Sequence, residues 1–323
     1  MPLTNVRIAP GINKADTPSG AEGQWIDGDF VRFRYGQPEK IGGYTAIGAE
    51  TISGPTRAQH TWNDLEGRRY AALGTSKALY IYYEGAFYDV TPLATAITGA
   101  TFTSTNGSDI ITVNKTTHPL DVGEYITFTA VSLPGGGVTG FTVADFESYT
   151  FEILTIATNS FTVRMKSNES GTGMTAAGSA SINPYEEIGP TIQTYGYGWG
   201  TGNWSRLTWG SGTTSSSIIL DPGSWSLDNF GEQLIATIKD GKTFTWNPGV
   251  SNPLDQRSTI MVGAPTSSRL TITSDRDRHV VHFGTETTIG DVATQDPMFI
   301  RFSDQENYNI YQPTSINTAG TFR

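Results

Sequence analysis

Four histidines and a few paired carboxylates are the side chains of this sequence whose types could serve metal binding or catalysis. His279 and His282 lie three residues apart, and on a strand this spacing puts them on opposite faces, where they cannot chelate one metal ion. No motif places a nucleophile or a carboxylate beside His60 or His118. We therefore expect structural histidines and no metal site.

Two pairs of aspartates have a spacing that a glycosidase could use. Asp27 with Asp29, and Asp275 with Asp277, would each share one face of a strand. Glycosidases act with two carboxylates about 5 to 9.5 Å apart, but an aspartate at a hairpin end is more often a turn residue. The Ser-x-Asp-x-Gly-x-x-Trp box of sialidase-like propellers is missing around Asp228. We expect no catalytic residues, and a propeller glycoside hydrolase is the least favoured alternative.

The sequence offers no pattern for a cofactor. It contains no cysteine, which excludes disulfides, thiolate zinc sites, iron–sulfur clusters and thiol nucleophiles. Its glycine run at 133–138 is followed by neither a Walker lysine nor a helical pattern, so a phosphate-binding loop is not indicated. We predict no cofactor and no enzymatic activity.

Charge limits the choice of partners. The 31 acidic and 21 basic residues give a formal net charge of −10, whereas gripping duplex DNA needs clustered Lys and Arg that this sequence lacks. Arg32 and Arg34 would share one strand face and could contact nucleic acid or a partner protein. Ion pairing with nearby acids across strands is the favoured account. No stretch approaches the roughly 18 apolar residues of a membrane span, so we expect no membrane insertion.

Strands are predicted to position these residues. Short alternating runs rich in Val, Ile, Thr, Tyr and Phe are separated by Gly, Asn, Asp or Pro, and no helical apolar pattern lasts three turns. A unit of about four strands, the size of a propeller blade, recurs three times, with turns expected at Gly74, Glu84-Gly85 and Asp240-Gly241. The sequence thus predicts an all-β protein with a β-propeller that is either small or incomplete.

An insertion interrupts this repeat. Residues 97–183 are rich in Thr, Ser and Gly and contain none of the seven Trp, and their strands suffice for a small β-sandwich or barrel. We therefore divide the chain into the N-terminal segment with the first propeller blades at 1–96, the inserted domain at 97–183, and the remaining blades at 184–323.

A loop rich in glycine and aromatic residues follows the insertion. It carries Trp199, Trp204 and Trp209. Loops of this kind often make contacts, so we select these tryptophans, together with Arg32 and Arg34, as candidate interaction residues. Their rings could stack on sugars, which leaves receptor or glycan binding open as a function.

Several segments resemble the tail nozzle or packaged-DNA stabilisation proteins of short-tailed bacteriophages. The resemblance rests on Pro10 to Asn13, Gly23 to Tyr44, Trp225 to Glu232 and Gly241 to Pro248. The insertion, from His118 to Phe128 and from Tyr149 to Val163, is similar to small β-modules found in phage tail proteins.

This resemblance implies a virion structural protein. Members of the family form homo-oligomeric rings at the tail nozzle or head–tail junction, contact other tail, adaptor or portal proteins, and retain and guide genomic DNA without sequence-specific binding. It also implies assembly in the host bacterial cytoplasm, and it transfers no catalytic residues. An acidic ring lumen would let DNA slide, because it repels the phosphate backbone. A receptor- or glycan-binding tail protein is the main alternative.

Overall fold

The structure is a computed structural model, and it describes residues 8–43, 45–46, 51–135, 138–191, 221–249, 254 and 256–323. The chain divides into two compact units, Met1–Ala49 and Glu50–Arg323. Strands dominate the described ranges, which also contain the short helix α1 (Val143–Glu147), the 3-10 turn η2 (Val292–Thr294) and a single 3-10 residue at Leu254. The prediction of an all-β protein is therefore confirmed.

The N-terminal unit contains two small pairs of strands. The strands are β1 (Ala9–Ile12) with β2 (Gln24–Trp25), and β3 (Val31–Arg34) with β4 (Gln37–Lys40). Tyr35 and Gly36 join β3 to β4 with φ of 51° and 76°. Positive φ at both turn residues matches the right-handed twist of a hairpin, and glycine adopts it without steric cost.

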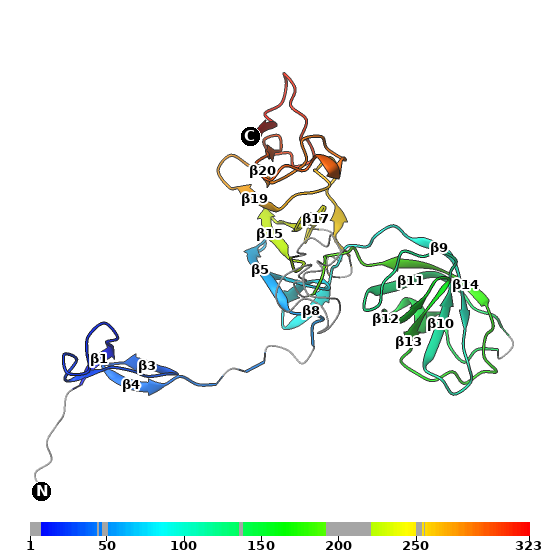
Figure 1. The fold of residues 1–323 in the computed structure, drawn as a ribbon, viewed down its shortest axis with the longest axis horizontal. Coiled ribbons are helices and arrows are strands. Elements are labelled where there is room, and N and C mark those ends of the chain that lie inside the picture. Colours follow the sequence, from blue (N-terminus) through cyan, green and yellow to red (C-terminus); the bar gives the residue numbers. More distant parts are fainter. Residues whose placement is uncertain are drawn as a thin grey trace, which may run out of the picture. The chain divides into compact units, whose positions relative to one another are not determined.

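The larger unit contains three four-stranded antiparallel sheets (Figure 1). The first sheet consists of β5 (Thr56–Asn63), β6 (Arg69–Thr75), β7 (Leu79–Tyr83) and β8 (Ala86–Asp89). The second consists of β15 (Trp225–Phe230), β16 (Gln233–Ile238), β17 (Thr243–Trp246) and β18 (Thr259–Ile260). The third consists of β19 (Leu270–Ser274), β20 (His279–Phe283), β21 (Ile300–Phe302) and β22 (Gly320–Phe322). Each sheet is a meander of sequential neighbours.

The turns follow the sequence signals with one exception. Glu84 and Gly85 link β7 to β8, and Asp240 with Gly241 links β16 to β17, as predicted. The turn expected at Gly74 is wrong, because Gly74 lies inside β6 and pairs with Leu79 of β7. Glycine suits this strand position because Trp225 of the second sheet approaches its backbone too closely for a side chain.

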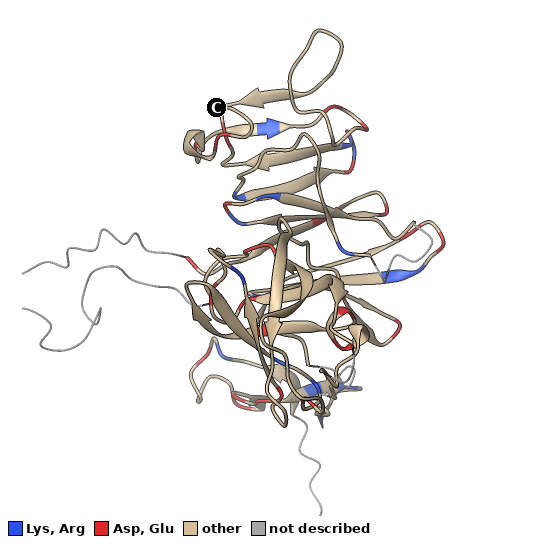
Figure 2. Ribbon diagram, turned by 90° about the vertical axis from the view of Figure 1, so that its right-hand side faces the viewer, with Lys and Arg blue, Asp and Glu red and all other residues tan. Residues whose placement is uncertain are grey.

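The three sheets stack face to face in chain order (Figure 2). Between the first and second sheets, Trp62, Tyr70 and Trp246 pack edge to face or tilted, with ring centroids 5.5 to 6.1 Å apart. Trp225 of β15 donates its indole N–H to the carbonyl of Thr75 in β6 at 3.0 Å. A closed propeller is not identified in the described residues; the coarser prediction of repeated antiparallel sheets is what the structure shows.

A closed six-stranded barrel is inserted between the first and second sheets. Its strands are β9 (Ile97–Thr103), β10 (Ile110–Asn114), β11 (Tyr125–Ser132), β12 (Thr150–Ala157), β13 (Ser160–Arg164) and β14 (Ala177–Pro184). Phe102, Phe128 and Phe146 fill its centre and are fully buried. Of the predicted sandwich or barrel, the structure forms the barrel.

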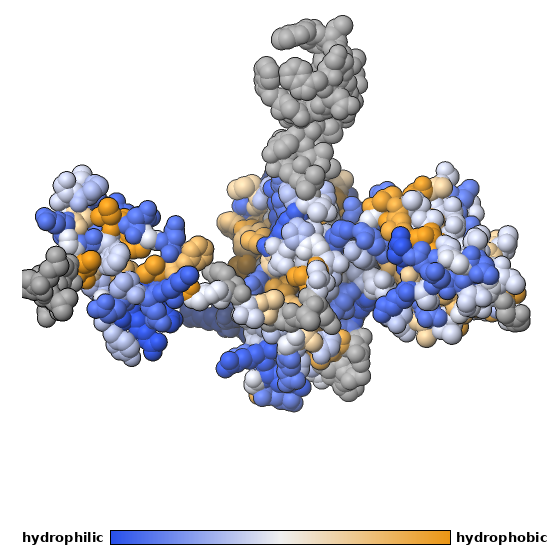
Figure 3. All heavy atoms as spheres, turned by 90° about the horizontal axis from the view of Figure 1, so that it is seen from below, coloured by the Kyte–Doolittle hydropathy of each residue, from blue (hydrophilic) through white to orange (hydrophobic). Residues whose placement is uncertain are grey.

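Surface character is mixed. Lys and Arg are scattered among Asp and Glu along the stacked sheets (Figure 2). In the view of Figure 3, hydrophobic side chains gather in small patches among hydrophilic ones. Among the described residues, no helix is long and apolar enough to cross a bilayer.

Substitution of Gly74 tests the close approach of the first two sheets. A Cβ at position 74 would lie 2.6 Å from Cδ1 of Trp225, so Gly74→Ala should lower the free energy of unfolding by about 2 kcal/mol through overpacking. Urea denaturation measures this loss. Gly135→Ala is the matched control, because a Cβ there meets nothing within 4 Å. Equal losses in the two variants would contradict the assignment.

Candidate functional site

The interaction residues chosen from the sequence fall into two groups. Trp199, Trp204 and Trp209 lie outside the described residues. Arg32 and Arg34 share the exposed face of β3, as expected. Arg32 donates two hydrogen bonds to the Glu39 carboxylate of β4, at 3.1 and 3.2 Å, and thus makes the cross-strand ion pair that the sequence favoured.

Neither acid pair lies on a strand: Asp27 and Asp29 lie in the connection between β2 and β3, and the other pair lies in a turn. Asp275 and Asp277 are exposed in the turn between β19 and β20. Asp27 pairs with Lys14 at 3.1 Å, and the hydrogen bond from Lys14 lowers the pKa of that carboxyl. His279 and His282 lie on opposite faces of β20, as predicted, with His282 buried and His279 half-buried. Within the described ranges, no group of three or more acidic or histidine side chains is placed to hold a metal ion.

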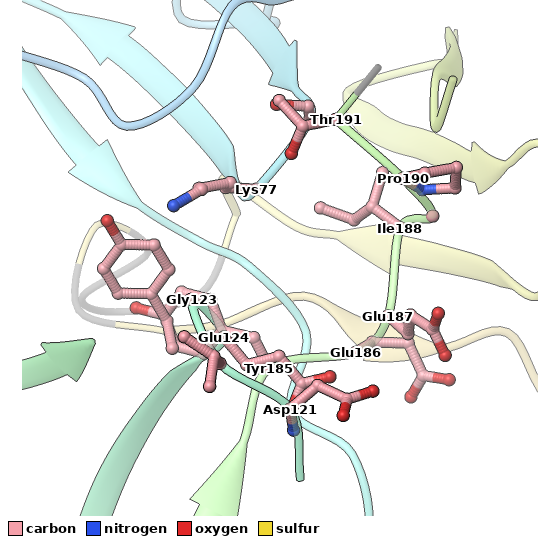
Figure 4. Close-up of a pocket in the computed structure, with 14 residues that line it drawn as sticks. Lys77, Asp121, Gly123, Glu124, Tyr185, Glu186, Glu187, Ile188, Pro190 and Thr191 are labelled. Carbon is pink, nitrogen blue, oxygen red and sulfur yellow. The ribbon is translucent and has the colours of Figure 1, made fainter. Parts of the chain in front are cut away.

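One cleft lies where the barrel joins the stacked sheets. It has a volume of about 330 Å³ and is lined by Ser76 and Lys77 of the β6–β7 turn, by 121–125 at the start of β11, and by 185–191 after β14. In the view of Figure 4, the carboxylates of Asp121, Glu186 and Glu187 lie on the side away from Lys77. We call this hollow the junction cleft.

The junction cleft carries an excess of negative charge. Lys77 binds Glu152 of β12 at 2.9 Å, and its ammonium lies 5.2 Å from the ring centroid of Tyr125. Burial, together with the charges of Asp121 and Glu187, raises the pKa of Glu124 above its ordinary value. The cleft therefore offers hydrogen-bond acceptors and a Glu that gains a proton more readily than usual. This arrangement suits a polar ligand that has hydrogen-bond donors.

One polar cluster ties the barrel to two sheets beside this cleft. Arg257, ahead of β18, donates to the Tyr185 hydroxyl at 3.0 Å, to the Asp89 carboxylate at 3.3 Å and to the Thr91 carbonyl at 3.1 Å. Its guanidinium also lies 4.7 Å from the Tyr185 ring. Tyr185 donates its hydroxyl to Asp89, and burial, followed by the charge of Asp89, raises the pKa of Tyr185. The cluster joins the end of β8, the exit of the barrel and the second sheet.

Loss of Arg257 should loosen this connection. Arg257→Met removes the hydrogen bonds to Asp89, Tyr185 and Thr91, so we expect the free energy of unfolding to fall by about 2 kcal/mol and protease cleavage around 185–191 to accelerate. Limited proteolysis followed by mass spectrometry reads out the cleavage. Arg269→Met is the control, since Arg269 pairs with Asp240 on the surface at 3.1 Å and should cost roughly 0.5 kcal/mol or less. A wild-type rate of cleavage in Arg257→Met would show that Arg257 does not hold the barrel to the sheets.

The sequence pointed to neither the junction cleft nor this cluster. Asp89, Tyr185 and Arg257 come from segments that are far apart in the chain, so no spacing rule links them. The one local signal is that Tyr185 and Glu186 directly follow the last strand of the insertion. Residues at the exits of an inserted domain are the ones that must contact its host.

Comparisons with known proteins give little further guidance. No protein-family model matches the sequence, and no curated protein matches it. A solved structure, the "Phage phi92 endosialidase", aligns with 13% identity and a TM-score of 0.23 over 85% of this chain. This chain spans 39% of the length of that one. These values are too low to transfer a fold or an activity, so the resemblance to the tail nozzle family stays a prediction.

Proposed function

We propose that this chain is a structural protein of a bacteriophage tail that acts through its binding surfaces. The observation that carries the proposal is the repeated architecture: three four-stranded sheets stack on one another, and a closed barrel is inserted between the first two. Apolar and aromatic side chains fill the contact between the first two sheets. Such a stack is a rigid scaffold from which the barrel can be presented. One of the segments that resemble phage tail proteins, Trp225 to Glu232, contains the opening strand of the second sheet.

Within that class, we propose a ring at the tail nozzle or head–tail junction that guides DNA. The net charge of −10 supports this role, because an acidic lumen repels the DNA backbone and lets it slide. Electron microscopy of the particle that contains this chain tests the proposal directly. A ring of this protein with an acidic lumen is expected, and a strongly basic lumen would count against it.

Receptor or glycan binding is a second candidate, and the junction cleft favours it. Its carboxylates accept hydrogen bonds of the kind that sugar hydroxyls donate. The full chain, added to host cells, should then bind saturably and block phage adsorption. Glu187→Ala, which removes a carboxylate lining the cleft, should weaken that binding, while Glu66→Ala, on an exposed side chain, should not.

The two candidates separate in one set of measurements. Gold-labelled antibodies against this chain should mark the phage tail in both cases. A structural role predicts that phage lacking the protein yield particles with defective tails, whereas a receptor role predicts complete particles that fail to adsorb. Absence of label from the virion would reject both.

A further inference from the structure

The third sheet presents an apolar face to the outside of the stack. Its side chains form two rows that run directly across the strands. The first row is Leu270, Phe283, Ile300 and Phe322, and the second row begins with Ile272 and Val281. Leu270 is 47% exposed, Ile272 43% and Phe322 69%. We call these residues the outward face of the third sheet.

This pattern is unusual for a sheet with one solvated face. Such a sheet normally alternates apolar residues toward the core with polar residues toward water. Here the opposite face, packed on the second sheet, carries the buried polar residues Thr271, His282 and Arg301. The apolar residues of this sheet thus lie on its outward face, as expected of a contact surface.

The stack itself indicates what kind of surface covers it. β15, which opens the second sheet, lies against β5, and β19, which opens the third, lies against β15. In both contacts, the first strand of a sheet therefore packs against the first strand of the sheet before it. A further sheet placed on the outward face of the third would continue an interface that this chain already makes twice.

The other end of the stack offers a matching surface. On the outward face of the first sheet, Tyr82 lies between Ala71 and Phe87 in one cross-strand row. The next row pairs Leu73 with Tyr80 and ends at Asp89, whose carboxylate is held by Arg257. These side chains are half-buried, and the rings of Tyr82 and Phe87 lie 5.1 Å apart. The row through Ala71, Tyr82 and Phe87 therefore carries no charge. The two rows that form the outward face of the third sheet likewise contain no charged residue.

We propose that the outward face of the third sheet docks on the outward face of the first sheet of a second copy of this chain. The contact is heterologous, so its repetition gives a ring if the rotation closes and a filament if it does not. This inference rests on the proposed structural role and names the surface that assembly would use.

Sedimentation velocity of the full chain tests the contact. The wild type should associate as its concentration rises. Ile272→Asp places a charge in the apolar contact and should weaken association roughly 100-fold or more, with an unchanged far-ultraviolet circular dichroism spectrum, because Ile272 is 43% exposed and its loss opens no cavity. Ile316→Asp, at a loop position that is 94% exposed, is the matched control and should associate like the wild type.

A mixing experiment distinguishes this contact from a symmetric one. Ile272→Asp blocks the third sheet, and Tyr82→Asp blocks the first, so each variant alone should be monomeric. Mixed together, they should form a one-to-one heterodimer that grows no further, since each contributes one intact face.

Three outcomes would overturn the proposal. They are a wild type that stays monomeric at every concentration, a Tyr82→Asp variant that is folded yet still dimerises, and a mixture that yields no heterodimer. A different protein of the particle found on the third sheet, with this chain monomeric, would likewise reject the second copy. None of these results would remove antibody label from the phage tail, so the contact and the proposed function fail separately.

Discussion

Replacing Glu169 by alanine should destabilise the barrel by roughly 3 kcal/mol or more, the largest loss that we expect from a single substitution in this chain. Hydrogen exchange measured by mass spectrometry would show it as faster exchange throughout β9 to β14. The stacked sheets would be affected less, because their cores are separate from that of the barrel.

The reason is the environment of this carboxylate. Glu169 is 1% exposed and accepts hydrogen bonds from the backbone N–H groups of Gly140 and Gly171 and from the hydroxyls of Ser104 and Thr139. Burial alone would raise the pKa of Glu169, but these four hydrogen bonds lower it below the ordinary value. Alanine would leave all four donors unpaired in a buried site.

Two comparisons sharpen this prediction. Glu169→Gln keeps the size of the side chain but turns an NH₂ group toward existing donors, so it should recover little of the stability. Glu152→Ala is the control, because that side chain is 43% exposed and its loss should cost about 0.5 kcal/mol. Similar losses for Glu169→Ala and Glu152→Ala would show that Glu169 does not hold the loops together.

Acid should destabilise the contact between the second and third sheets, and His282→Gln should remove part of that sensitivity. Burial, together with the nearby charge of Arg301, lowers the pKa of His282 from 6.5 to about 3. The folded state therefore keeps this histidine neutral while the unfolded chain takes up a proton below pH 6.5. Stability is fully present above pH 6.5 and falls as the pH drops toward 3, by up to about 1.4 kcal/mol per pH unit.

The contacts of His282 explain why it resists protonation. Its Nδ1 lies 3.1 Å from the Ser268 hydroxyl and 3.2 Å from that of Thr271, and its Nε2 lies 3.1 Å from the Tyr311 hydroxyl. No acidic side chain is hydrogen-bonded to the ring in the described part of the chain, so nothing there would stabilise an imidazolium. A proton would have to enter a fully buried site beside Arg301.

Urea denaturation at several pH values measures this effect. Between pH 6.5 and 4.5 the unfolding free energy of the wild type should fall more steeply with decreasing pH than that of His282→Gln. The two slopes should differ by nearly the value for one proton, about 1.4 kcal/mol per pH unit. At pH 8 the histidine is neutral in both the folded and the unfolded state, so the stability difference between His282→Gln and the wild type there measures the lost hydrogen bonds alone. If His279→Gln, on the opposite face of β20, removed the same slope instead, the assignment to His282 would be wrong.

What the sequence determined by itself is the local structure. Alternating apolar residues predicted the strands, and Glu84-Gly85 and Asp240-Gly241 predicted two hairpins, because strand periodicity and turn geometry depend on neighbouring residues. The absence of tryptophan from residues 97–183 indicated a separate β-domain, and its strands close into the barrel.

Only the tertiary structure decided which residues became buried and coupled. Gly74 was expected in a turn but lies in a strand, where Trp225 from a later sheet approaches its backbone. No sequence pattern pointed to Glu169, yet its carboxylate binds Gly140 and Ser104 from distant loops of the barrel. Burial and pKa depend on which surfaces face each other, and those contacts join segments that no local pattern relates.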